Sequence, residues 1–266
     1  MPALIANDGL RIDGTLIIMA VGKDGIIIAA DSRTDITKNA LEDTLPLAYF
    51  DSTEKITALR HYAVAITGMP ATNMVDLAER LEEFDSANAQ PLPLTQYINA
   101  FYRYLYSQIP RSDFLAFRDT YIIFTGYDND LPRIVITKIS EDGMGFRSIE
   151  SKDSTVSSWN ASPYFKYAKG LSCYKLGKMA EKSIYAFAKE NHRQNKIGGP
   201  ISILKINPDG TKEWIQNDFS KHIQTQWDML KLYKLHRLKI TYLQAGAERI
   251  VDSMFKTNFP TILGIR

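Results

Sequence analysis

Two apolar segments joined by a very short turn constrain this chain more strongly than any other feature. Residues 16–22 and 26–31 are rich in Ile, Val, Leu and Ala and show no alternation of polar and apolar residues. The turn between them, Lys23-Asp24-Gly25, ends on a glycine that can adopt a positive φ. Strands without polar alternation are typically buried on both faces. We therefore predict a β-hairpin in a sheet that is covered on both sides.

The rest of the chain separates into groups of helices and groups of strands. Apolar residues recur every three or four positions over about 70–84, 97–109 and 164–192, which predicts three helices. Expected strands cover 55–56, 61–67, 120–127, 133–139, 144–150, 201–206 and 211–215. The polar segment 32–53 is predicted to be a loop or a loose hairpin. Grouped elements favour the α+β class, and two stacked sheets with helices outside would cover every apolar strand.

Charge and residue content argue against several classes of function. A formal net charge of +2 gives no strong field, so we expect neither a nucleic-acid partner nor a membrane partner. The four histidines lie far apart and none pairs at metal-ligand spacing, so no metal or other cofactor is expected. The single cysteine, Cys173, excludes an intramolecular disulfide, and its helical surroundings predict a core thiol rather than a nucleophile.

The start of the chain and its apolar runs predict where the protein works. Residues 1–14 lack the basic start and the apolar run of a secretory signal. No segment approaches the ~20 apolar residues that span a bilayer. We therefore expect a cytoplasmic protein, and its 266 residues suffice for one large domain or two small ones.

A glycine and a threonine, Gly14 and Thr15, stand immediately before the first apolar strand. A threonine hydroxyl needs an adjacent base to act as a nucleophile, and an N-terminal threonine carries one in its own α-amine. That amine has a pKa of about 7.7–8.0, which suits general-base catalysis near neutral pH. Thr15 becomes N-terminal only if the Gly14–Thr15 bond is cut. Gly14 lacks a Cβ and so allows the tight geometry in which the Thr15 hydroxyl reaches its carbonyl.

A carboxylate is expected beside this threonine. Asp31 ends the second strand of the hairpin, and the hairpin returns the chain to the start of the first strand. A buried ammonium nearby would favour the threonine alkoxide and help to keep the α-amine neutral.

The sequence around these residues resembles the active β-type subunits of the 20S proteasome and their bacterial relatives, which are N-terminal-nucleophile hydrolases. The likeness extends over about 14–215, and its specific part is Gly14-Thr15, Asp31-Ser32-Arg33, Glu54-Lys55-Ile56 and Ala65-Ile66-Thr67-Gly68. It implies that Thr15 is the nucleophile and that Asp31 and Lys55 are its catalytic partners. By the same resemblance, the backbone N–H of Gly68 forms the oxyanion hole, and Ile66 lines the pocket for the residue before the cut. Ile66 reads equally well as a plain core residue.

The resemblance also implies a fold and a domain plan. The family has a four-layer αββα sandwich, which here would cover residues 15–216. Residues 1–14 would be a short propeptide that is removed by autoprocessing. Residues 217–266 would form a C-terminal extension with a helix over about 221–255, either continuous or broken. This extension would be either an extra helical layer or an arm that contacts another subunit.

The sequence departs from the family at three places. The interval between Asp31 and Lys55 is longer than usual, and its extra residues fall in the polar segment 34–53. A supporting serine has only Ser158 and Ser162 as candidates. The position of the supporting aspartate holds an uncharged Gln194 or Asn195, and Glu190 is a candidate substitute.

These observations predict a threonine endopeptidase that cleaves itself and then peptide or protein substrates. The resemblance implies a homo-oligomeric ring, with an unfoldase or cap as a further partner. Two other functions stay open at this point. One is an amidase of the same mechanism that acts on small amides, and the other is an unprocessed ring or scaffold subunit without catalysis.

Overall fold

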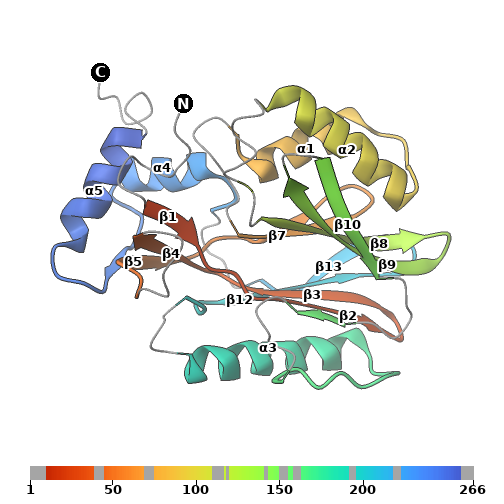
Figure 1. Cartoon of the computed structure of the whole chain (residues 1–266). Helices are drawn as coiled ribbons and strands as arrows, with labels where there is room; N and C mark the ends of the chain where they lie inside the picture. Colours follow the sequence, from red (N-terminus) through yellow and green to blue (C-terminus); the bar gives the residue numbers. More distant parts are fainter. Residues whose placement is uncertain are drawn as a thin grey trace.

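The structure, a computed structural model, describes residues 10–38, 45–68, 75–109, 117, 120–140, 143–149, 155–157, 163–191, 196–217 and 223–258. Within these segments the strands form three sheets of antiparallel pairs, and five helices lie around them (Figure 1). The predicted mixture of helices and sheets is therefore confirmed.

The predicted hairpin forms the centre of a five-stranded sheet, called here the hairpin sheet, of order β11-β2-β3-β12-β13. Its strands are β2 (Ile17–Gly22), β3 (Gly25–Asp31), β11 (Thr155–Ser157), β12 (Ile201–Ile206) and β13 (Lys212–Gln216). Every residue of β3 is buried, as its lack of polar alternation predicted. Helix α3 (Cys173–Glu190) covers the outer face of this sheet and shares an apolar cluster with it.

A second five-stranded sheet, the partner sheet, has the order β10-β9-β8-β7-β6. Its strands are β6 (Ile56–Ala58), β7 (Ala63–Thr67), β8 (Tyr121–Asp128), β9 (Leu131–Ser140) and β10 (Gly143–Ile149). Helices α1 (Leu77–Ala87) and α2 (Leu94–Gln108) cover its outer face. Phe84 packs edge to face on Tyr97 and Phe101 there, which joins the two helices in one aromatic cluster.

The hairpin sheet and the partner sheet pack together through their inner faces. Met19 and Ile28 of the hairpin sheet lie in one buried cluster with Ala65 and Ile123 of the partner sheet. Figure 1 shows α3 outside one sheet and α1 and α2 outside the other. Asp31 ends β3 of the hairpin sheet, and Lys55 directly precedes β6 of the partner sheet. This end of the stack therefore brings together one charged side chain from each sheet.

A third sheet, called here the side sheet, has the order β1-β4-β5-β14. Its strands are β1 (Leu10–Asp13), β4 (Arg33–Lys38), β5 (Ala48–Asp51) and β14 (Thr241–Tyr242). The segment 32–53, predicted as a loop or a loose hairpin, thus contributes two paired strands to it. The end of the predicted propeptide is itself a strand, which the sequence pattern did not indicate.

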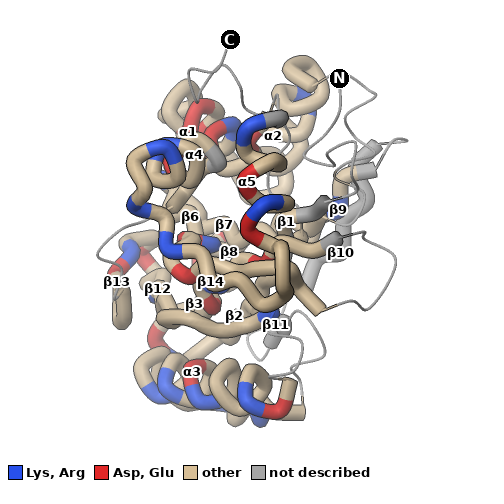
Figure 2. The backbone as a smooth tube through the Cα atoms, turned by 90° about the vertical axis from the view of Figure 1, so that its left-hand side faces the viewer, with Lys and Arg blue, Asp and Glu red and all other residues tan. Residues whose placement is uncertain are grey.

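Over its described residues 223–258, the C-terminal extension forms two helices, which is the broken form of the expected helix. Helix α4 (Gln226–Lys234) ends near His236, whose φ of 53° is incompatible with a continuing helix, and α5 (Ala247–Asn258) follows strand β14. Figures 1 and 2 show both helices beside the side sheet. Their apolar side chains share one buried cluster with it, called here the side core: Ile12, Ile36, Leu47, Ala48, Phe50, Ile223, Met229, Leu230, Ala247, Val251, Met254 and Phe255. The extension is therefore packed against β1, which leads to Thr15, and against β4, which follows Asp31.

The side core gives a stability prediction. Leu230 is fully buried on α4, so Leu230→Ala is expected to lower the free energy of unfolding by ~2–5 kcal/mol through lost burial and a residual cavity. The matched control is Leu235→Ala at the end of the same helix, because Leu235 is 51% exposed. That change is expected to stay within ~0.5 kcal/mol of the wild type. Denaturant unfolding measures both, and equal values would show that the extension is not an integral part of the fold.

Candidate active site

Asp31 and Lys55 form a buried ion pair at the end of the stacked sheets. The Lys55 Nζ lies 2.9 Å from Asp31 Oδ1, and both side chains are almost fully removed from solvent. The Asp31 carboxylate also accepts backbone N–H bonds from Leu16 at 2.7 Å, Arg33 at 3.2 Å and Gly198 at 3.1 Å. A buried carboxylate with this many donors is held in one orientation. Asp31 therefore fixes the position of the lysine ammonium.

The Lys55 ammonium points at the bond that precedes Thr15. Besides Asp31, it donates to the carbonyl oxygen of Arg33 at 2.5 Å and to the carbonyl oxygen of Gly14. The Thr15 hydroxyl lies 2.7 Å from the same Gly14 oxygen. An ammonium has three donors, and three oxygens accept them here. The cation and the hydroxyl thus meet at one carbonyl group.

The backbone at Gly14 has a conformation that L side chains rarely adopt. Its φ is +100°, and a Cβ built there would lie 2.4 Å from Asp35 Oδ1 and 2.7 Å from the carbonyl oxygen of Lys196. Both contacts are far shorter than van der Waals distance. A residue other than glycine would move the chain, and with it the carbonyl group that Thr15 and Lys55 share.

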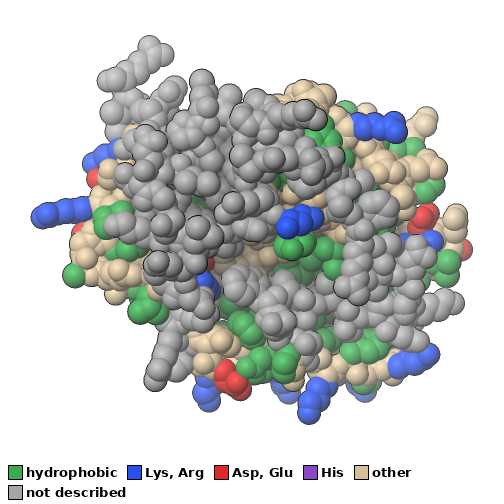
Figure 3. All heavy atoms as spheres, viewed as in Figure 1, with side chains coloured by type: hydrophobic (Ala, Val, Ile, Leu, Met, Phe, Trp, Pro, Cys, Tyr) green, Lys and Arg blue, Asp and Glu red, His purple; other side chains and the backbone are tan. Residues whose placement is uncertain are grey.

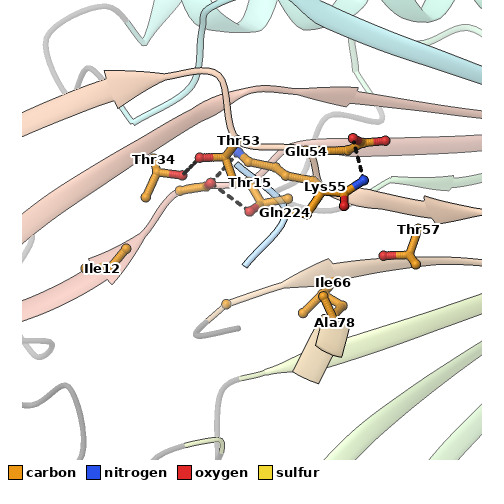
Figure 4. A pocket seen from close by; sticks show the side chains of 12 residues that line it. Ile12, Thr15, Thr34, Thr53, Glu54, Lys55, Thr57, Ile66, Ala78 and Gln224 are labelled. Atoms are coloured by element: carbon orange, nitrogen blue, oxygen red, sulfur yellow. Dashed lines mark hydrogen bonds between the residues drawn. The ribbon is translucent and has the colours of Figure 1, made fainter. Parts of the chain in front are cut away.

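A pocket next to this carbonyl collects the other residues that the sequence indicated. Gly14, Thr15, Lys55, Ile66 and Gly68 all line it, and Asp31 lies behind Lys55. Figure 4 shows Ile66 and Ala78 together on one side of the pocket, away from Thr34 and Thr53. Gly68 follows β7 with a φ of +93°, a conformation natural to glycine. The structure thus brings together residues from four separate parts of the chain.

Sequence reasoning missed several neighbours of this site. Gln224 of the C-terminal extension lines the same pocket, and its side-chain amide donates to the Glu54 carboxylate at 3.2 Å. Gly198 bonds Asp31 through its backbone N–H, and the Arg33 guanidinium makes a bidentate pair with Asp51 at 2.8 and 3.0 Å. The only sequence signals were the glycine pair at 198–199 and the arginine two residues after Asp31, and neither pattern specifies a partner.

Of the candidates for the supporting serine and the supporting aspartate, the structure describes only Glu190. Ser158, Ser162, Gln194 and Asn195 lie outside the described residues. Glu190 is described at the end of α3, where its carboxylate accepts a hydrogen bond of 2.6 Å from the Tyr164 hydroxyl. Among the described residues that line the pocket, Glu190 is not found. Its role as a substitute for the supporting aspartate therefore has no geometric support.

Cys173 is buried at the start of α3, as predicted for a core thiol. Burial, helped by the Asp24 carboxylate, raises the pKa of this thiol to about 12. Since only the thiolate reacts, we expect native protein at pH 8 to react with iodoacetamide at least ~100-fold more slowly than unfolded protein, as measured by mass. The folded state keeps a proton that the unfolded thiol releases above its ordinary pKa of about 8.5, so this group's contribution to stability falls as pH rises from there towards 12. Rapid alkylation of the native protein would contradict this account.

Other kinds of site are not evident in the part of the chain that the structure describes. No group of His, Cys, Asp and Glu there has the arrangement of a metal site. None of the described helices is long and apolar enough to cross a bilayer. On the coloured part of the face in Figure 3, basic and acidic side chains are scattered among apolar ones.

Comparison with known proteins finds a likeness in fold, whereas the comparisons with family models and with curated proteins find no match. Two solved structures of Anbu from Hyphomicrobium sp. strain MC1 do match its fold. The Gly-1 mutant has a TM-score of 0.54 at 14% identity, covering 78% of this chain and 89% of that chain. A second Anbu structure has a TM-score of 0.52 at 13% identity, covering 77% and 89%.

The chain shares the fold of Anbu. The likeness indicates an N-terminal-nucleophile-like fold, which agrees with the broad fold that the sequence resemblance implies. It does not support the narrower assignment to proteasome β subunits. At 14% identity, this likeness concerns the fold alone, and the activity has to be argued from the site.

Proposed function

We propose that this chain is a threonine peptidase of the N-terminal-nucleophile type, built on the four-layer αββα sandwich and activated by cutting its own Gly14–Thr15 bond. One observation carries the proposal: the Thr15 hydroxyl and the Lys55 ammonium both contact the Gly14 carbonyl oxygen. This places a nucleophile beside the bond to be cut and a cation on the oxygen that becomes negative. Asp31 holds that cation in place.

Self-cleavage would proceed by transfer of an acyl group from nitrogen to oxygen. The Thr15 Oγ attacks the Gly14 carbonyl carbon, and the Lys55 ammonium stabilises the resulting oxyanion. The hydroxyl proton passes to the Thr15 nitrogen as its bond to that carbon breaks, which leaves an ester between Gly14 and the Thr15 side chain and a free α-amine on Thr15. Water hydrolyses this ester, giving a carboxylate on Gly14 and restoring the Thr15 hydroxyl. Residues 1–14 leave as the propeptide.

Peptide hydrolysis would then use the new amine as the general base. It accepts the proton of the Thr15 hydroxyl while Oγ attacks a substrate carbonyl, and the same proton passes to the departing amine. Water releases the acyl group from Thr15. We assign the Gly68 N–H to the oxyanion and the surface of Ile66 and Ala78 to an apolar side chain before the cut. Ile66 and Ala78 both line the pocket, and an apolar wall favours an apolar substrate residue.

Two measurements test this function. The intact mass of the purified protein is expected to lack Met1–Gly14, and a fluorogenic peptide is expected to be hydrolysed in preference to a small amide. Loss of residues 1–14 with hydrolysis of the small amide alone would favour the amidase. An intact N-terminus without labelling by a threonine-reactive epoxyketone would favour the scaffold subunit and reject the peptidase.

The remaining expectations also belong to this proposal. A homo-oligomeric ring, an unfoldase or cap partner and a cytoplasmic location follow from the proteasome-like resemblance. Native mass measurement of the purified protein tests the ring, since a monomer at micromolar concentration would reject it.

A further inference from the structure

Strand β1 lies where a peptide would have to lie to present a carbonyl group to Thr15. It comprises residues 10–13, directly before the bond whose cleavage is proposed. It pairs antiparallel with β4, and the register sets Ile12 opposite Ile36 and Asp13 opposite Asp35. Main-chain pairing of this kind recognises any extended peptide, because it uses groups that every residue has.

The side chain of Ile12 occupies an apolar site that the C-terminal extension helps to build. Ile12 is 5% exposed and belongs to the side core, together with Ile36 of β4. Leu230 of α4 and Phe255 of α5 belong to the same buried cluster. Ile12 also lines the pocket that contains Thr15, so this apolar site is continuous with the candidate active site. Figure 1 shows β1 below α4, and Figure 2 shows it close to α5.

We propose that β1 marks the substrate groove, and that β4 with helices α4 and α5 forms a subsite for a large apolar side chain. This side chain belongs to the residue two positions before the one whose carbonyl Thr15 attacks, as Ile12 stands two positions before Gly14. The ligand is therefore an extended peptide with an isoleucine-like residue at that position. The catalytic consequence rests on the proposed function, whereas binding in the groove does not.

The strand geometry makes this selection sensitive to position. Successive side chains of a strand point to opposite faces, so a shift of one residue would carry the apolar side chain away from the side core. While β1 is covalently attached, it competes with any free peptide at a high effective concentration. The groove is thus open to substrates only after β1 has left it. The C-terminal extension thereby has a role in substrate specificity.

The test frees the groove without depending on catalysis. In a Thr15→Ala chain, which keeps residues 1–14 attached, Ile12→Asp places a charge in the side core and is expected to release β1, seen as at least tenfold faster amide hydrogen exchange of residues 10–13. Labelled Leu-Arg-Ile-Asp-Gly, which repeats residues 10–14, is then expected to bind by fluorescence anisotropy. Leu-Arg-Asp-Asp-Gly and the shifted Leu-Ile-Arg-Asp-Gly are expected to bind at least about tenfold more weakly, because neither buries an isoleucine there.

Controls separate the groove from general effects. Leu131→Asp, made in the same Thr15→Ala chain, changes a residue that is 44% exposed at the start of β9, and this variant is expected to bind none of the peptides because β1 stays attached and still fills the groove. Ile12→Ala serves if Ile12→Asp does not fold, as judged by thermal melting. Equal binding of all three peptides overturns the subsite. So does an absence of binding after β1 has been released, or unchanged exchange of β1 in both Ile12 variants.

The outcomes also distinguish this inference from the proposed function. Preferential binding of the isoleucine peptide, with an uncut wild-type chain, would support the groove and reject the peptidase. Removal of residues 1–14 and peptide hydrolysis without a preference at this position would support the peptidase and reject the subsite.

Discussion

Thr15→Ala is expected to leave residues 1–14 attached and to abolish peptide hydrolysis. The change removes the hydroxyl that lies 2.7 Å from the Gly14 carbonyl oxygen, so neither self-cleavage nor acyl transfer has a nucleophile. Loss of the nucleophile in enzymes that use a serine costs about 10⁶-fold in turnover, and we expect a loss of similar order. Thr15→Ser keeps a hydroxyl on the same carbon and is expected to keep both activities at a reduced rate. Intact mass and a fluorogenic peptide assay measure the two effects.

A neighbouring threonine provides the matched control. The Thr53 hydroxyl lines the same pocket and lies 2.8 Å from the Thr34 hydroxyl. Thr53→Ala also removes one threonine hydroxyl from the pocket, but it leaves Thr15 and its contact with the Gly14 carbonyl oxygen in place. Self-cleavage is therefore expected to continue. A Thr15→Ala chain that still loses residues 1–14 would refute autoprocessing, because a second protease would then be responsible.

Lys55→Ala is expected to destabilise the fold as well as to stop self-cleavage. Asp31 is 1% exposed, and removal of the ammonium would leave its carboxylate buried without its cation. Breaking a buried ion pair by deleting one partner typically costs ~3–5 kcal/mol. Denaturant unfolding is expected to show a loss of this size, and the intact mass is expected to retain residues 1–14.

A double substitution separates the two effects of Lys55. In Lys55→Met with Asp31→Asn, no charge is left buried and alone, so part of the lost stability is expected to return. Self-cleavage is expected to stay absent, because no cation lies on the Gly14 carbonyl oxygen. A Lys55→Ala chain within ~1 kcal/mol of the wild type would show that this pair is not a structural necessity. A double variant that still cleaves itself would remove Lys55 from the mechanism.

Local patterns in the sequence were sufficient for much of the fold. The hairpin of β2 and β3 followed from two apolar runs and a short turn, and the helices of the partner sheet followed from their apolar spacing. Errors arose where local signals are weak. Helix α3 begins at Cys173 instead of about 164, because Gly170 has a positive φ and the Ser172 side chain caps the first turn. Strand β11, only three residues long, is too short to show a period.

The sequence by itself determined which residues are available for catalysis: a glycine before a threonine, and then an aspartate, a lysine and a glycine in a recognisable order. Only the tertiary structure decided their geometry, since the Gly14 carbonyl, Thr15, Asp31 and Lys55 meet through contacts between two sheets. It also decided that residues 10–13 pair with β4 beside the C-terminal helices. The spacing of apolar residues in a segment indicates only which of that segment's own faces are buried. Which segments meet depends on burial and pairing between residues far apart in the chain, and no local pattern records that.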